Sequence, residues 1–289
     1  MPANFIQALK PPTPWPNLMT DITQISGTTR VYAIIADPIH HVQTPQAMNT
    51  LFSNLRQDRV MVPFHVSPAD LAGVVTGLRG IQSLDGFIVT VPHKTAILEL
   101  CDTVSDAARL VGAVNVVTRS NDGKLHGEIL DGEGFVTGLR QAGIELQGRA
   151  VYLAGAGGAA NAIAFALAAS GIGWLTIANR SQDKAKALVE RLSRAFPDLQ
   201  VSVGTSDPSG YDLVVNGTSL GLKEGDALPC DVTRLTAEQV VAEIIMQPVI
   251  TPLLAAAQKV GCRIHEGLPM LLCQIELMAA AMASKKNES

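Results

Sequence analysis

Basic clusters, paired cysteines and metal-ligand spacings are all missing from this sequence. Its 289 residues hold 22 Lys and Arg against 26 Asp and Glu, so the formal net charge is −4 at pH 7. Without a basic patch, a nucleic-acid partner is not expected. The four cysteines form neither a CxxC pair nor a Cys/His pattern, which predicts reduced, buried thiols and no bound metal.

Signals for secretion and membrane insertion are missing too. No basic segment followed by an apolar segment stands at the N-terminus, so a secretory signal is not expected. The longest apolar stretch, residues 162–169, is rich in alanine and too short to cross a bilayer. The sequence therefore predicts a cytoplasmic protein that makes no membrane contact.

What the sequence does contain is enough apolar material for two domains, since 47% of its residues are hydrophobic. Residues 1–29 are expected to form an arm, because the prolines at 11–16 favour extended backbone. From Arg30 onward, short apolar segments alternate with helical ones, which is typical of an α/β fold. Strands are predicted at 31–36, 60–66, 86–91, 113–119, 124–130, 150–154, 174–178, 199–203 and 213–215, and helices at 45–57, 68–78, 95–100, 161–170 and 269–283. The last helix could close the second domain or return to the first.

A glycine-rich turn directly follows the predicted strand at 150–154. Gly155 would permit the tight turn, and Gly157, which has no Cβ, would let the backbone approach a phosphate. Ala160 stands where the G-x-G-x-x-G/A pattern needs a small residue for close packing of helix and strand. Free N–H groups and the helix dipole then favour an anion. The predicted pyrophosphate site of a dinucleotide is Gly155, Ala156, Gly157, Gly158 and Ala159.

The end of the next strand indicates which dinucleotide binds. An NAD site usually carries Asp or Glu there for the ribose 2′-hydroxyl. This chain has instead Asn179, Arg180 and Ser181, with Lys184 one turn further on. A guanidinium matches a phosphate in charge and shape. Singly, Arg180 and Lys184 could be solvated charges at a helix start; together they favour the 2′-phosphate of NADP.

A lysine and an aspartate mark candidate chemistry in the N-terminal half. Lys94 follows a predicted strand and Pro92, and ligands of open α/β sheets bind at such strand ends. Asp131 also follows a predicted strand and is flanked by glycines. A carboxylate beside a lysine could orient it for proton transfer. We therefore expect Lys94 and Asp131 to face each other across a cleft, although each could singly be a surface charge.

Eight ordered blocks resemble the shikimate/quinate dehydrogenase family over residues 30–283. They are residues 37–45 (D-P-I-H-H-V-Q-T-P) with Asn49, 89–94 (V-T-V-P-H-K), 112–115 (G-A-V-N), 131–134 (D-G-E-G), 155–160, 179–181, 216–221 and 267–274. The resemblance implies an N-terminal α/β substrate domain, a Rossmann dinucleotide-binding domain and a C-terminal helix that returns to the first domain. The domain bounds it implies are 30–130 with 268–289 for the substrate domain, and 131–267 for the NADP-binding domain.

The resemblance also implies a reaction and residue roles. The reaction is reversible hydride transfer between NADP(H) and a ring alcohol or ketone, as in aromatic amino acid biosynthesis. Lys94 and Asp131 would be the catalytic pair. The substrate-binding residues would be Val42, Thr44, Thr90, Asn115 and Gln274. Besides the glycine turn and residues 179–184, the cofactor-binding residues would be Asn216, Thr218, Met246 and Gly267. The partners expected are a small-molecule substrate and, at most, a second copy in a homodimer.

Several positions depart from the family pattern in the same direction. Val42 replaces the first serine of the substrate loop, Met246 replaces a tyrosine, and Ile88 and Leu130 replace polar residues. The serine and the tyrosine normally serve the substrate carboxylate, and a hydrogen bond to a charged group is worth about 1.5–3 kcal/mol. Retained chemistry on an altered, less polar substrate is therefore expected. Partial compensation could come from His41, Gln43 and Thr44.

Three functions remain open from the sequence. The chain could oxidise shikimate itself, it could act on another cyclic hydroxy compound such as quinate, or it could be a non-catalytic sensor of NADP. The presence of both Lys94 and Asp131 argues against the sensor, since a binding module needs neither. A methylene-tetrahydrofolate dehydrogenase shares the architecture broadly but fits these blocks poorly.

Overall fold

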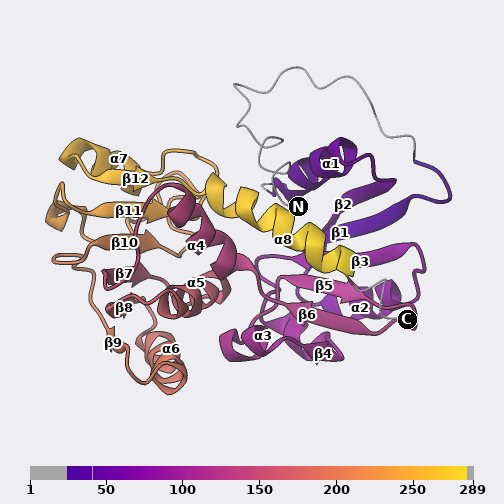
Figure 1. Cartoon of the computed structure of the whole chain (residues 1–289), viewed down its shortest axis with the longest axis horizontal. Coiled ribbons are helices and arrows are strands. Elements are labelled where there is room, and N and C mark those ends of the chain that lie inside the picture. The colour runs from indigo at the N-terminus through magenta and orange to yellow at the C-terminus, as the bar shows by residue number, and fades with distance from the viewer. Residues whose placement is uncertain (1–24, 41, 285–289) are drawn as a thin grey trace.

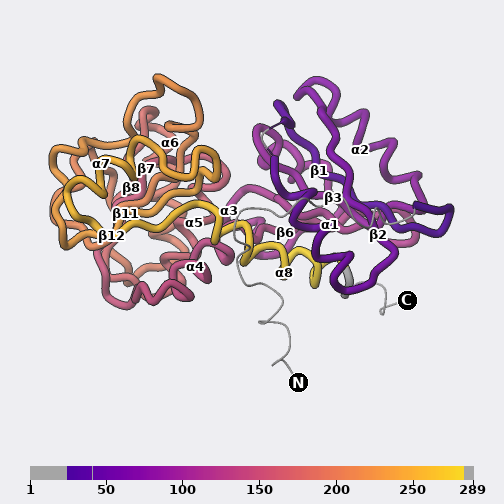
Figure 2. The backbone as a smooth tube through the Cα atoms, turned by 90° about the horizontal axis from the view of Figure 1, so that it is seen from above, coloured from indigo at the N-terminus to yellow at the C-terminus, as the bar shows by residue number. Residues whose placement is uncertain are grey.

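The computed structural model describes residues 25–40 and 42–284, which form two lobes, each built on a six-stranded sheet (Figure 1). The predicted arm falls outside the described residues up to position 24, as do His41 and residues 285–289. Figure 2 shows the two lobes side by side, with α8 crossing from one to the other. No helix in the described ranges has the length and apolar character needed to cross a membrane.

The first sheet occupies the N-terminal lobe and has the strand order β2-β1-β3-β5-β6-β4. Its first three strands run parallel, and β5 pairs antiparallel with both β3 and β6. The strands are β1 (Arg30–Ala36), β2 (Arg59–His65), β3 (Leu84–Val89), β4 (Thr103–Val104), β5 (Val116–Arg119) and β6 (Leu125–Glu128). The helices of this lobe are α1 (Thr44–Asn54), α2 (Leu71–Arg79), the 3₁₀ helix η2 (Ala96–Leu100) and α3 (Asp106–Val111).

The second sheet is entirely parallel, with the strand order β12-β11-β10-β7-β8-β9. Counted from β7, this is the doubly wound order 3-2-1-4-5-6, whose ligand crevice lies between the first and fourth strands. The strands are β7 (Ala150–Ala154), β8 (Trp174–Ala178), β9 (Gln200–Val203), β10 (Leu213–Asn216), β11 (Val240–Glu243) and β12 (Arg263–His265). The helices are α5 (Gly158–Ala169), α6 (Gln182–Ala195), the 3₁₀ helix η3 (Val232–Arg234) and α7 (Pro252–Val260). The expected α/β architecture with a Rossmann domain is confirmed.

Helices α4 (Asp131–Gln141) and α8 (Leu268–Ser284) join the two lobes. A Cβ at Gly132 would collide with the carbonyl oxygen of Ala162 in α5, and a Cβ at Gly134 would collide with the Gln274 side chain in α8. Glycine at both positions therefore lets α4 pack closely against a helix on each side. Leucine and methionine side chains of α8 pack into the cluster formed by α1 and the first sheet, so the C-terminal helix does return to the first lobe.

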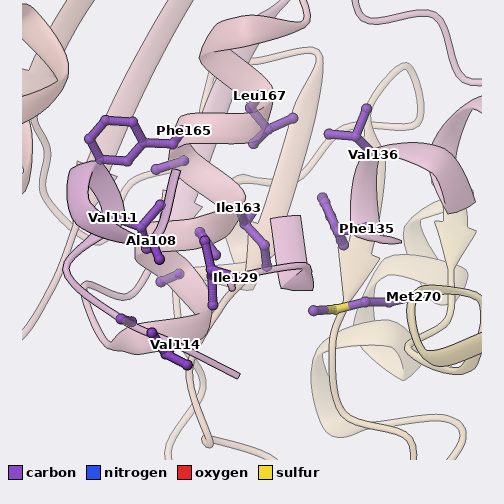
Figure 3. Close-up of a cluster of buried hydrophobic side chains, with 14 of the residues drawn as sticks. Ala108, Val111, Val114, Ile129, Phe135, Val136, Ile163, Phe165, Leu167 and Met270 are labelled. Atoms are coloured by element: carbon purple, nitrogen blue, oxygen red, sulfur yellow. The ribbon is translucent and has the colours of Figure 1, made fainter. Parts of the chain in front are cut away.

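One apolar cluster continues through both lobes. It includes Phe87 of the first sheet, Leu153 of the second and Phe135 of α4. Figure 3 shows part of this cluster, where Ile163 of α5 lies near Ile129 and where Met270 approaches Phe135. Burial of apolar surface is favourable whichever lobe supplies the side chains. This shared cluster therefore holds the two lobes in place against each other.

Several elements differ from those expected, and each difference has a local cause. The helix after the glycine turn begins at Gly158 rather than at residue 161, because extended Gly157 already serves as its N-cap. Helix α3 was not expected, since six residues are too few to show a periodic pattern; its start is capped by Ser105, whose hydroxyl accepts a hydrogen bond from Ala108 N (3.1 Å). Helix α4 was missed because Gly132, Gly134 and other glycines lower its helix propensity, and packing against its neighbours outweighs that cost.

A buried histidine accompanies the close packing of α4. His265 ends β12 with 5% of its surface exposed, and its ring meets Phe135 edge to face with centroids 6.4 Å apart. Within the described part of the chain, its Nε2 has no hydrogen-bond partner. Burial, with a smaller contribution from Arg263, lowers the pKa of His265 below its usual value of 6.5.

We expect His265 to make the protein less stable in mild acid. The pKa of His265 is lower in the folded state, so the unfolded chain takes up a proton first as the pH falls. The free energy of unfolding is therefore unaffected by His265 above about pH 6.5, and below it decreases by at most about 1.4 kcal/mol per pH unit. Denaturant unfolding of wild type and His265→Leu at pH 7.5 and 5.5 measures this. The variant should lose less stability between the two pH values, and an identical loss in both proteins would contradict the prediction.

Candidate functional site

The expected ion pair between the two candidate catalytic residues is present. Lys94 lies in the turn after β3 and Asp131 is the first residue of α4, and Lys94 Nζ donates a hydrogen bond to Asp131 Oδ2. Only 12% of the lysine side chain and 4% of the aspartate side chain are exposed. Because two buried charges cost desolvation energy unless they are well paired, this arrangement is unlike an ordinary surface salt bridge.

Two predicted substrate-binding residues hold Asp131 in place. Asn115 Nδ2 donates to Asp131 Oδ1 (2.8 Å), while its Oδ1 accepts from Leu130 N (2.8 Å). Gln274 Nε2 donates a longer bond to the Asp131 carbonyl oxygen (3.4 Å). Asn115 is 1% exposed and Gln274 is 4% exposed. Asn115 therefore orients the carboxylate and Gln274 holds the backbone of Asp131, and their contact with substrate stays a prediction.

Backbone hydrogen bonds fix the segment that carries Lys94. Val114 N donates to the Lys94 carbonyl (2.8 Å), and Thr90 N donates to the Ile35 carbonyl (3.0 Å). This places Thr90, which is half-buried, at the carboxyl ends of β1 and β3. Thr44 is buried at the first position of α1. The structure thus places both threonines in the first lobe, and their substrate contact also stays a prediction.

The glycine turn lies directly beside Lys94. Gly155 has φ +118°, a conformation that favours glycine, and its N–H donates to the Ala178 carbonyl (2.7 Å). A Cβ at Gly157 would meet no atom of the described residues within 4 Å, whereas one at Gly158 would lie 3.3 Å from Lys94 Cβ. The start of α5 therefore presents open space and free N–H groups next to the ion pair, which fits a dinucleotide pyrophosphate.

The other predicted cofactor residues follow the carboxyl ends of the second sheet. Asn179, Arg180 and Ser181 follow β8, Asn216 ends β10, Met246 comes three residues after β11, and Gly267 comes two residues after β12. Arg180 and Lys184 are exposed, and neither forms an ion pair within the described ranges. The register of β7 with β8 brings Arg180 to the side of the glycine turn, so its guanidinium is available for a 2′-phosphate.

A buried carboxylate supports the carboxyl ends of the second sheet and was not among the predicted site residues. Glu243 is fully buried, and its two oxygens accept from Asn216 Nδ2 (3.1 and 3.0 Å) and from Thr251 Oγ1 (2.9 Å). Loss of hydration raises the pKa of Glu243, and these hydrogen bonds oppose the increase. The signal in the sequence that could have indicated Glu243 was an acidic residue directly after the apolar run 240–242.

Three of the predicted cofactor residues have contacts of their own within the protein. Asn216 is fully buried with its amide bound to Glu243. Thr218 N and Oγ1 both donate to Asn216 Oδ1 (3.0 and 2.7 Å), which orders the loop after β10. Met246 packs with the first lobe's apolar residues. The contact of all three with the cofactor stays a prediction.

The four departures from the family pattern gather in one place. Val42, Leu130 and Met246 all pack against the buried cluster that contains Ile88 and Tyr32, and we call this set the substrate-side apolar cluster. Val42 and Met246 belong to loops, Leu130 follows β6 and Ile88 lies in β3. Only the fold brings these four residues together. All four carry apolar side chains where the family pattern has hydroxyl and amide groups, and their place beside the substrate stays a prediction.

Within residues 25–40 and 42–284, no group of three or more His, Cys, Asp or Glu side chains is arranged to hold a metal ion.

Comparisons with known proteins agree with this geometry. A family model described as shikimate dehydrogenase substrate binding domain matches residues 34–117, and one described as shikimate/quinate 5-dehydrogenase matches residues 138–219. The chain is 39% identical to the NADP(+)-dependent shikimate dehydrogenase of Geobacter metallireducens over 89% of this chain and 92% of that protein.

Two solved structures are similar throughout. Shikimate 5-dehydrogenase from Listeria monocytogenes, in complex with shikimate and NAD, is 33% identical with a TM-score of 0.81, and the match covers 91% of this chain and 94% of that one. The ligand-free 5-ketofructose reductase of a Gluconobacter species is 31% identical with a TM-score of 0.78, covering 89% of this chain and 94% of that one.

Proposed function

The chain belongs to the shikimate/quinate dehydrogenase family, and we propose that it transfers hydride between NADP(H) and a ring alcohol or ketone that is less polar than shikimate. The family membership makes it an NADP-dependent oxidoreductase of the shikimate dehydrogenase type. The identity of its substrate is the new part of the proposal.

We assign cofactor binding and proton transfer to different residues. NADP(H), when bound, supplies or accepts the hydride. The glycine turn would hold its pyrophosphate, and Arg180 with Lys184 would hold the 2′-phosphate. Lys94 would exchange a proton with the reacting hydroxyl or carbonyl oxygen, while Asp131 keeps the ammonium group in position. The burial of this pair limits its contact with bulk water.

The observation that carries the substrate proposal is the substrate-side apolar cluster. A carboxylate moved next to Val42 and Met246 would lose hydrogen bonds to water without gaining replacements from these side chains. A neutral or less polar group would instead gain from burial against them. The Gluconobacter relative, a 5-ketofructose reductase, supports a substrate other than shikimate on this fold.

Shikimate itself is the second candidate, because the curated Geobacter relative at 39% identity is a shikimate dehydrogenase. The two candidates separate in a steady-state assay of NADP+ reduction with shikimate, quinate and ring alcohols that lack a carboxylate. Higher kcat/KM for one of the uncharged alcohols supports our proposal. Higher kcat/KM for shikimate than for every uncharged compound contradicts it.

The domain bounds belong to the same proposal. We assign substrate recognition to residues 30–130 with 268–289 and cofactor binding to residues 131–267. The matches of the two family models at 34–117 and 138–219 support this division. The oligomeric state, monomer or homodimer, stays a prediction.

Replacing Arg180 should weaken NADPH binding selectively. One charge-assisted hydrogen bond to a phosphate is worth about 1.5–3 kcal/mol, so Arg180→Ala should raise the Kd for NADPH roughly 10- to 150-fold. The Kd for NADH should stay near the wild-type value, because NADH has no 2′-phosphate. Fluorescence titration with both cofactors measures this, and Lys186→Ala, another exposed cation of α6, is the control. Tighter binding of NADH than NADPH by the wild type would contradict the assignment.

A further inference from the structure

A hollow away from the glycine turn lies between α3 of the first lobe and helices α5 and α6 of the second. Its volume is about 370 Å³, which falls within the range of small-ligand pockets, roughly 300–1,000 Å³. The lining residues are Arg109, Leu110, Phe165, Arg191, Arg194 and Ala195. Figure 3 shows Phe165 beside Ala108 and Val111, at the contact between α5 and α3.

The lining combines cationic and apolar side chains. It contains three guanidinium groups and no carboxylate. Arg191 Nη1 donates to the carbonyl of Val111 (2.7 Å), and its guanidinium lies over the Phe165 ring at 5.9 Å from the centroid. Leu110 is 51% exposed, so an apolar wall is available to a ligand.

The three guanidinium groups repel one another, and none of them forms a salt bridge within the part of the chain that the structure describes. Burial lowers the pKa of Arg191, and the neighbouring Arg194 lowers it further. An anion between the guanidinium groups would remove that repulsion, and guanidinium binds carboxylate and phosphate oxygens in pairs.

The hollow is separate from the cofactor cradle. Phe165 lies seven residues after the start of α5, about 10 Å along the helix axis, and Arg191 lies about 14 Å along α6 from Gln182. The cofactor residues gather at the opening turns of these two helices, so a dinucleotide bound there leaves the hollow accessible.

We propose that this hollow binds a small organic dianion, a phosphate monoester or a dicarboxylate carried on an apolar body. Arg109 and Arg194 contact the charged group, and Leu110 contacts the apolar body. Arg191 keeps its bond to α3 and adds its charge from the wall. Because α3 belongs to the first lobe and α6 to the second, the ligand would tie the two lobes together.

Calorimetric titration of the full chain, saturated with NADPH to occupy Arg180, tests this. The probes are phenyl phosphate and phenylsuccinate, with inorganic phosphate as the ion without an apolar body. We expect saturable binding of at least one organic probe, tighter than that of inorganic phosphate. Arg109→Ala and Arg194→Ala should each weaken that binding about tenfold or more, and Leu110→Ser should weaken the organic probe but not inorganic phosphate.

Lys259→Ala removes an exposed cation from α7 and is the matched control, with unchanged binding expected. Arg191 is left intact because its loss would expose the end of α3. If neither organic probe binds better than inorganic phosphate, or if Arg109→Ala and Arg194→Ala bind as the wild type does, the proposal is wrong. Preference for phenyl phosphate or for phenylsuccinate would identify the charged group.

Discussion

Lys94→Ala should lower kcat roughly 100- to 10,000-fold, the range expected when a positioned proton-transfer group is removed. The ammonium group is the cation within reach of Asp131, and its removal leaves the reacting oxygen without a proton partner. NADPH affinity should change far less, because the glycine turn and Arg180, not Lys94, are the proposed cofactor contacts. Steady-state kinetics together with fluorescence titration of NADPH measure the two effects separately.

The chain contains a second Lys–Asp ion pair, which serves as a control for this experiment. Lys124 and Asp122 form an exposed ion pair with a 2.9 Å contact in the same lobe, so Lys124→Ala should leave kcat unchanged. Asp131→Asn should also lower kcat strongly, because the amide has no negative charge and offers one acceptor oxygen to the two donors Lys94 Nζ and Asn115 Nδ2. Effects of residues that act as a unit do not add, so the double variant should resemble the single ones. Near-normal kcat in Lys94→Ala would exclude the lysine from the chemistry.

The double variant Val42→Ser with Met246→Tyr should use shikimate much better than the wild type. Each restored hydrogen bond to a carboxylate is worth about 1.5–3 kcal/mol, so two of them correspond to roughly a 100-fold gain or more in kcat/KM. The gain should come mainly from KM, since Lys94 and Asp131 are unchanged. Wild type should show a high KM for shikimate with measurable turnover.

The control for size is Val42→Ala with Met246→Leu, which alters packing without adding a hydrogen-bonding group. It should not improve shikimate kinetics. If the wild type already shows a low micromolar KM for shikimate with rapid turnover, Val42 and Met246 do not face the carboxylate, and Gln43 or Thr44 serves it instead. In that case the less polar substrate proposed above is withdrawn.

The strand-turn-helix segment at 150–169 could be predicted because its signals are local. An apolar strand, a glycine at positive φ and a small-residue helix follow one another in the chain, and the structure has them in that order. The pairing of Lys94 with Asp131 spans 37 positions and depended on both residues standing at strand ends. The strands β3 and β6 run in the same direction on either side of antiparallel β5, so their carboxyl ends lie at the same edge of the sheet.

Other parts of the site could not be predicted, because they depend on contacts between distant segments. Helix α4 contains glycines that argue against a helix, and their reason is visible only once α5 and α8 are packed against it. The buried contact of Asn216 with Glu243 joins residues 27 positions apart on different strands. The packing of Met246 with α8 and the first sheet likewise joins distant parts of the sequence.

The hydrogen bonds around Asp131 bear on the order in which the ligands bind. Lys94 and Asn115 both come from the first lobe, and Asp131 opens the helix that leaves it. The proposed proton-transfer pair is therefore complete without any group from the second sheet. A cofactor bound at the glycine turn would come to lie beside Lys94 without having to assemble this pair. We therefore expect substrate and NADP(H) to bind in either order and to meet the same preorganised lysine.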